Sequence, residues 1–172
     1  MKVFGIAGTS GSGKTTLTEA LIRRFTEDGV RVAAVKHTHH GFDLDTPGKD
    51  SYRMREAGST DVVLVSESRL VLMREYRAAP EPELPDVLAL LSPCDLVLVE
   101  GYKRSAVPKL EVYRPSRGKP PLWPEFPDVV AVASDEPLTT PLPQLDLNDV
   151  DAIYAFIRDY LTRSPEITVP QR

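Results

Sequence analysis

The strongest chemical pattern in the sequence is a glycine-rich segment near the start of the chain, Gly8-Thr9-Ser10-Gly11-Ser12-Gly13-Lys14-Thr15. It fits the pattern Gly, four residues, Gly-Lys-Ser/Thr, in which backbone N–H groups cradle the phosphates of a nucleotide. We expect Lys14 to contact the β- and γ-phosphates, Thr15 to place its hydroxyl on Mg²⁺, and Thr16 to lie near the α-phosphate. The segment therefore predicts a site for a nucleoside triphosphate and Mg²⁺, without choosing the base or the reaction.

A second candidate stands at the end of the apolar run 96–99, where Glu100 is followed by Gly101. In proteins with such a cradle, an acidic residue at the carboxyl end of another buried strand helps to hold Mg²⁺. The long side chain of Glu100 suits a water-mediated contact to the metal or the orientation of an attacking water, and both roles stay open. The alternative is a surface glutamate, which Gly101 disfavours because glycine here indicates a close backbone approach.

The segment 36–51 contains all three histidines of the chain, His37, His39 and His40, together with three carboxylates. It should leave the carboxyl edge of a parallel sheet, where ligands bind. Three interpretations compete for the histidines: a metal site, donors to a phosphate or a pterin with His37 as the candidate, and solvated loop residues. Asp45 and Asp50 could approach Mg²⁺ or position a water, and Lys49 could neutralise a phosphate. The alternative for Asp50 is to cap the following helix, which does not exclude the first role.

The base of the nucleotide has one candidate reader. The guanine signature Asn-Lys-x-Asp does not occur in the sequence, but Asp135 follows the apolar run 129–133. A carboxylate at this place could accept both N1–H and the exocyclic amino group of guanine, which adenine does not offer. The alternative is a plain loop aspartate before Pro137, so guanine preference rests weakly on this residue.

Apolar runs alternate with helical patterns along the chain and predict an α/β domain. Expected strands are 2–7, 30–36, 61–66, 70–74, 95–99, 109–113 and 129–133, and expected helices are 14–28, 50–57, 84–91 and 149–161. Only three residues separate runs 61–66 and 70–74, so this pair should form an antiparallel hairpin. We therefore predict a three-layer P-loop fold over 1–163 with a mostly parallel sheet, a mobile proline-rich loop over 114–127 and a frayed tail over 164–172.

Composition limits the classes of function. The chain has 172 residues and a net charge of −4, which disfavours general nucleic-acid binding because that requires a basic surface. Its single cysteine, Cys94, has no partner within the chain and fits a reducing compartment. No apolar run approaches the roughly 20 residues that a membrane-spanning helix needs. We expect a cytoplasmic protein without a membrane partner.

Taken together, these segments resemble the MobB-type molybdopterin-guanine dinucleotide biosynthesis adaptors. The matching pieces are residues 8–15, 36–40, 45–51, 57–58, 95–103, 131–135 and 146–150. The resemblance implies a homodimer that binds GTP and Mg²⁺, hydrolyses GTP slowly, and assists a MobA-type guanylyltransferase in attaching GMP to molybdopterin. It keeps the roles of Lys14, Thr15 and Glu100 and brings the histidine segment near the nucleotide, with molybdopterin as a further candidate ligand. It also makes the hairpin 61–74 a candidate dimer contact.

Two other functions use the same cradle. A small-molecule kinase would transfer the phosphate to an acceptor, with basic residues of the loop 114–127 serving as its lid. A metallochaperone GTPase would deliver an ion through the three histidines of segment 36–40.

Overall fold

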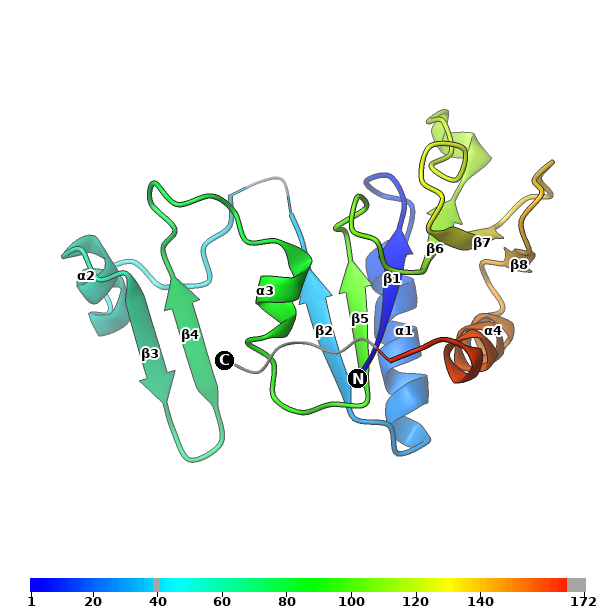
Figure 1. Ribbon diagram of the computed structural model, residues 1–172. Helices are drawn as coiled ribbons and strands as arrows, with labels where there is room; N and C mark the ends of the chain where they lie inside the picture. Colours follow the sequence, from blue (N-terminus) through cyan, green and yellow to red (C-terminus); the bar gives the residue numbers. More distant parts are fainter. Residues whose placement is uncertain (39–40, 167–172) are drawn as a thin grey trace. The chain divides into compact units, whose positions relative to one another are not determined.

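The computed structural model describes residues 1–38 and 41–166, which form two compact units (Figure 1). One unit comprises Met1–Thr38 together with the chain from Leu84 on, and the other lies within His39–Glu83. The predicted domain 1–163 spans both units. Residues 167–172 of the predicted tail lie outside the described residues.

A six-stranded sheet forms the centre of the first unit, and every neighbouring pair of its strands is parallel. In spatial order the strands are β2 (Val32–Lys36), β5 (Leu96–Glu100), β1 (Lys2–Ala7), β6 (Lys109–Tyr113), β7 (Val129–Ser134) and β8 (Gln144–Asp146). Figure 1 shows the arrowheads of β1, β2 and β5 pointing to the same edge. Because all six strands are parallel, their carboxyl ends meet at that edge, where α/β folds bind ligands.

Helices cover both faces of this sheet. On one face, α1 (Lys14–Glu27) and α4 (Val150–Arg163) pack with Phe4, Leu98 and Leu110 into the larger core cluster. On the other face, the short α3 (Leu84–Leu88) packs with Val97 and Val99 into a second cluster. Strands buried on both faces have unbroken apolar runs, so the three-layer prediction is confirmed. Within the described part of the chain, no helix is long and apolar enough to span a membrane.

Three local predictions for this unit were wrong. The third helix ends at Leu88 rather than residue 91, because the N–H groups of Leu90 and Leu91 bond to carbonyl oxygens three residues back, as in turns, instead of four. The strand β8 was missed, since three residues are too short to show a pattern. The segment 114–127, called here the β6–β7 segment, contains a 3-10 helix at Pro115–Arg117 where only irregular chain was expected.

The second unit contains the predicted hairpin and one helix. Strands β3 (Asp61–Val65) and β4 (Leu70–Arg74) pair antiparallel and form a two-stranded sheet of their own, which confirms the hairpin. The helix α2 (Asp50–Glu56) begins at the expected residue and ends one residue before the expected 57, and Lys49 takes the cap position in extended backbone. Asp50 is therefore not the cap. Its charge lies in the first turn, where it complements the helix dipole.

Candidate functional site

The glycine-rich segment forms the loop between β1 and α1, and its backbone explains its glycines. Gly8, Gly11 and Gly13 have φ angles of 142°, 75° and 101°, a region that side chains rarely allow. A Cβ atom at Gly8 would lie 2.4 Å from the carbonyl oxygen of Val112 on β6. The loop is therefore wrapped against the sheet in a conformation that only glycine permits at these positions.

The loop leads into α1, where backbone N–H groups and the Ser12 hydroxyl are available to a ligand. This helix begins with Lys14, Thr15 and Thr16 after the left-handed Gly13, so the N–H groups of its first turn carry the positive end of the helix dipole. Ser12 is fully buried, and none of the described residues gives its hydroxyl a hydrogen-bond partner. A buried polar atom usually has a partner, so this hydroxyl fits a loop shaped for a phosphate ligand.

Three of the predicted residues meet beside this loop. The Thr15 hydroxyl donates a hydrogen bond to Glu100 Oε1 at 3.0 Å, and Glu100 is only 8% exposed. Lys14 Nζ donates to the carbonyl oxygen of Thr9 at 2.8 Å. Burial lowers the pKa of Lys14, while the nearby Glu100 carboxylate opposes this shift. The arrangement offers a hydroxyl and a carboxylate to a hard cation and an ammonium group to phosphate oxygens.

Lys36 also belongs to this group, although the sequence did not predict it as a site residue. It ends β2, directly beside Glu100 in the sheet register. Its Nζ lies 3.4 Å from Glu100 Oε1 and donates a hydrogen bond to the Thr15 hydroxyl at 3.3 Å. The ammonium group thus contacts the same two oxygen atoms that Mg²⁺ would need. The only signal in the sequence was a basic residue at the end of an apolar run.

The chain after Glu100 makes the close approach that Gly101 predicted. A Cβ atom at Gly101 would lie 2.9 Å from both Cβ and the carbonyl oxygen of His37, and Gly101 has a φ of 95°. The next residue, Tyr102, has a φ of 46°, which is uncommon for a residue with a side chain. Its ring lies 4.4 Å from that of His37. The site therefore places His37 at the carboxyl edge of the sheet, next to the strand that carries Glu100.

Asp135, the predicted base reader, follows β7 at the same edge and is held by an arginine. Arg114 forms an ion pair with Asp135, and its Nε donates a hydrogen bond to the carbonyl oxygen of Ser12 at 2.9 Å. The guanidinium group therefore connects the glycine-rich loop to Asp135. A second arginine of the β6–β7 segment, Arg117, donates to the carbonyl oxygen of Ser10 at 3.5 Å. Neither contact was predicted from the sequence.

Two predicted site residues lie in the second unit. The Asp45 side chain is 5% exposed and forms an ion pair with Arg55, with an Nε to Oδ2 distance of 3.2 Å. The same carboxylate accepts hydrogen bonds from the Ser51 hydroxyl at 2.7 Å and from the backbone N–H of Thr46 at 3.0 Å. These contacts organise the chain before α2. Lys49 is exposed, and the roles of Asp45 and Lys49 at a nucleotide stay predictions.

The histidine interpretations are left open. His39 and His40 lie outside the described residues. Among the residues that are described, no group of three or more histidine, cysteine or acidic side chains could hold a metal ion.

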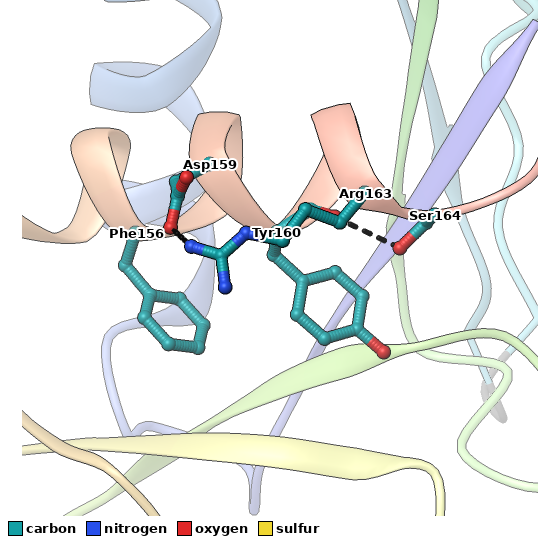
Figure 2. Close-up of a pocket in the computed structure, with 5 residues that line it drawn as sticks. All are labelled: Phe156, Asp159, Tyr160, Arg163 and Ser164. Atoms are coloured by element: carbon teal, nitrogen blue, oxygen red, sulfur yellow. Dashed lines mark hydrogen bonds and ion pairs between the residues drawn. The ribbon is translucent and has the colours of Figure 1, made fainter.

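A separate pocket lies at the C-terminal end of α4, and Figure 2 shows the five residues that line it: Phe156, Asp159, Tyr160, Arg163 and Ser164. Lys2, at the start of β1, donates a hydrogen bond to the carbonyl oxygen of Ser164. The pocket is thus near the amino edge of the sheet, opposite the glycine-rich loop, and contains none of the predicted site residues.

Comparisons with known proteins point to one family. A family model described as "Molybdopterin guanine dinucleotide synthesis protein B" matches residues 3–135. A Haemophilus influenzae protein named molybdopterin-guanine dinucleotide biosynthesis adapter protein is 42% identical over 163 residues, which cover 92% of this chain and 89% of the relative. An Escherichia coli protein of the same name is 37% identical, and the match covers 94% of each chain.

A solved structure supports the fold independently. The X-ray structure of a MobB protein homolog from Bacillus stearothermophilus has a TM-score of 0.72 at 29% identity, covering 95% of this chain and 100% of that one. The family match runs from β1 through the glycine-rich loop and Glu100 to Asp135, so it includes the whole site at the carboxyl edge. The chain therefore belongs to the MobB family.

Proposed function

We propose that this protein is a GTP-binding, slowly hydrolysing adaptor that assists the attachment of GMP to molybdopterin. The observation that carries the proposal is the hydrogen bond from Thr15 to Glu100 at 3.0 Å, which closes the site beside the glycine-rich loop. It brings together a hydroxyl and a carboxylate, the ligands that Mg²⁺ on a triphosphate requires from the protein. The names of the H. influenzae and E. coli relatives supply the pathway and the adapter role.

The triphosphate would bind in the loop through backbone N–H groups and Lys14. Lys14 would exchange its bond to the Thr9 carbonyl for the β- and γ-phosphates, since a charged donor prefers an anionic acceptor. Bound Mg²⁺ would supply neutralisation of the phosphate charge. Glu100 would hold a water of the metal or orient the attacking water.

The base would be read by Asp135. This residue follows β7, which lies two strands from β1 in the sheet, on the side away from β2. A carboxylate there can accept two N–H groups of guanine, whereas adenine offers no such pair. Arg114 would orient this carboxylate through their ion pair.

Calorimetric titration with GTP and ATP, each with and without Mg²⁺, tests the site. We expect Mg²⁺-dependent preference for GTP, loss of the preference in Asp135→Ala, and much weaker triphosphate binding in Lys14→Ala. Glu19→Ala, an exposed residue on α1 away from the loop, is the control. Equal affinity for the two nucleotides would refute guanine reading, and undetectable binding by the wild-type protein would refute the whole proposal.

Assembly as a homodimer would use the hairpin of the second unit. This hairpin exposes a group of large apolar side chains: Val63, Leu64, Val65, Leu70 and Leu72. Exposed apolar strands invite pairing with another chain, and a two-fold axis would let the same patch cover itself. Light scattering should therefore give the mass of a dimer for the wild-type protein and of a monomer for Val65→Lys, which places a charge on the face shared by Val63, Leu70 and Leu72. A monomeric wild-type protein would refute this part of the proposal.

The adaptor role itself requires a partner assay. Adding the protein to a MobA-type guanylyltransferase with GTP and molybdopterin should raise the yield of guanylated cofactor, and an unchanged yield would refute the role. The kinase alternative draws support from Arg114 and Arg117, which contact the glycine-rich loop as lid arginines would. A kinase would release GDP faster when its acceptor is added, so slow release that does not depend on an acceptor would exclude it.

A further inference from the structure

A guanidinium group lies directly on the glycine-rich loop. Arg117 Nη2 is 3.5 Å from the carbonyl oxygen of Ser10, and a Cβ atom at Gly11 would lie only 2.1 Å from the same nitrogen. Gly11 therefore does more than allow a positive φ, because any side chain there would displace Arg117. Lys14 contacts the neighbouring carbonyl, that of Thr9, so two cations bind adjacent carbonyls of one loop.

The β6–β7 segment holds Arg117 in this place. The 3-10 helix that carries it begins with Pro115, directly after Arg114, ends at Arg117, and is capped by Gly118, which has a φ of 63°. Further along, the fully buried Glu111 accepts hydrogen bonds from the backbone N–H groups of Leu122 and Trp123 at 2.8 to 3.0 Å. The Tyr113 and Trp123 rings pack edge to face, with centroids 5.4 Å apart.

The β6–β7 segment contains two arginines. Within the described part of the chain, Arg117 forms no ion pair with an acidic residue, whereas Arg114 does. Arg114 is committed to Asp135. The contact from Arg117 to Ser10 is long and joins a charged donor to a neutral acceptor, so an anionic phosphate oxygen would compete for the guanidinium group successfully.

We propose that Arg117 is an arginine finger supplied in cis, a catalytic residue that contacts the γ-phosphate of a nucleotide bound in the glycine-rich loop. The inference rests on the proposed function. In hydrolysis, the oxygen of water bonds to the γ-phosphorus while the bond to the β–γ bridging oxygen breaks. The electron pair of that bond stays on GDP, and the proton of water passes to the released phosphate. Arg117 neutralises charge on the phosphate oxygens as this bond breaks.

A finger in cis is compatible with slow turnover. Proteins that carry this arginine in their own chain hydrolyse GTP at about 10⁻² s⁻¹, far below the rates reached with a separate activating protein. Here the guanidinium must also leave the Ser10 carbonyl before it can reach the phosphate. Slow hydrolysis of GTP by the proposed adaptor is therefore consistent with an arginine finger in its own chain.

The test compares Arg117→Ala and Arg117→Lys with Lys119→Ala, a matched loss of one exposed positive charge two residues away. The first readout is capture of GDP with aluminium fluoride, which mimics the phosphoryl group in flight. The second is single-turnover hydrolysis of GTP. We expect Arg117→Ala to lose the capture and to hydrolyse at least about tenfold more slowly, with GDP affinity within about twofold of wild type.

Arg117→Lys should recover little, because an ammonium group lacks the planar fork of donors. Lys119→Ala should behave as wild type in both readouts. Unchanged capture and hydrolysis in Arg117→Ala, or a wild-type protein that binds GTP but does not capture GDP with aluminium fluoride, would overturn the finger. Failure of the wild-type protein to bind GTP at all would instead refute the proposed function. Trp123 fluorescence checks that each variant keeps the β6–β7 segment folded.

Discussion

Replacing Glu111 tests how the β6–β7 segment is held in place. This carboxylate is fully buried on β6, and it is the acceptor for two backbone N–H groups, those of Leu122 and Trp123. Both belong to irregular chain, where no strand or helix offers them another acceptor. We compare Glu111→Leu, which removes both acceptor oxygens, with Glu111→Gln, which keeps the shape and one oxygen.

The magnitude follows from the contacts. Leaving a buried donor unpaired costs about 1–3 kcal/mol, so two of them cost about 4 kcal/mol in Glu111→Leu. Relief of the buried charge offsets part of this, which leaves a loss of about 3 kcal/mol. In Glu111→Gln the remaining oxygen can take the place of Oε2, which serves Leu122 at 2.9 Å and Trp123 at 3.0 Å. The amide nitrogen then faces the N–H of Leu122, so we expect a loss of about 1 kcal/mol.

A pH dependence follows from the same burial. Desolvation raises the pKa of Glu111 above its ordinary value of 4.5, against the hydrogen bonds from the two N–H groups. At a pH between 4.5 and the raised pKa, the Glu111 carboxyl group is ionised in the unfolded chain but still protonated in the folded protein. Folding then takes up a proton, so this group makes the protein less stable as the pH rises towards the raised pKa. The glutamine in Glu111→Gln does not titrate. The amount by which the wild-type protein is more stable than this variant should therefore shrink as the pH rises.

The assay uses the fluorescence of Trp123, the only tryptophan of the chain. With a urea dependence of about 2 kcal/mol per molar, a loss of about 3 kcal/mol lowers the midpoint of unfolding by about 1.5 M. Circular dichroism followed in parallel shows whether the segment detaches before the sheet unfolds. If Glu111→Leu were as stable as Glu111→Gln, with unchanged Trp123 emission, the carboxylate would not be what holds the segment.

Three further predictions concern the sheet edges. Gly101→Ala should destabilise by about 2 kcal/mol or more, since its Cβ would collide with the end of the neighbouring strand. Gly58→Ala is the control, because Gly58 has a φ of 110° but open space around it, and it should lower the free energy of unfolding by only about 1 kcal/mol. If urea unfolding showed the same loss of stability for both variants, a collision at Gly101 would be contradicted. Hydrogen bonds from Arg31 lower the pKa of Asp95 from 3.8 to about 2, so Asp95→Asn should reduce stability at neutral pH. That difference should disappear in acid as wild-type Asp95 becomes protonated, and a gap independent of pH in thermal melts would refute the linkage. Lys36→Gln should lower the Mg²⁺ concentration for half-maximal GTP binding by about threefold, because a competing cation is removed, and calorimetry showing no decrease would contradict this.

The parts of the site that could be predicted from sequence are those that follow one another along the chain. A strand, a glycine-rich loop and a helix are adjacent in sequence, so their spacing alone indicated the loop between β1 and α1 and the place of Lys14 at the start of the helix. Glu100 could be recognised because it ends an apolar run, and Gly101 because a glycine there indicates a close backbone. The hairpin was predictable because only three residues separate its strands.

Contacts that depend on which strands become neighbours could not be predicted. Lys36 meets Glu100 only because β2 pairs with β5, a choice made by the packing of the whole sheet. The contact of Arg114 with the Ser12 carbonyl joins residues 102 positions apart in sequence. The proline-rich composition of 114–127 excluded regular helix but carried no information about where its arginines point.

The residues of β6 show how a sheet face that is covered by loops differs from one that is covered by helices. Leu110 and Val112 belong to the core under α1 and α4, while the alternate residues Lys109 and Glu111 are buried among loops. Lys109 Nζ donates to the carbonyl oxygen of Ser105 at 2.8 Å, as Glu111 accepts from backbone N–H groups. A helix satisfies its own backbone, but loops need such partners from the sheet. A buried strand that alternates apolar and charged residues therefore predicts a loop cover, and the part of that cover over Glu111 is the β6–β7 segment, which brings an arginine to the glycine-rich loop.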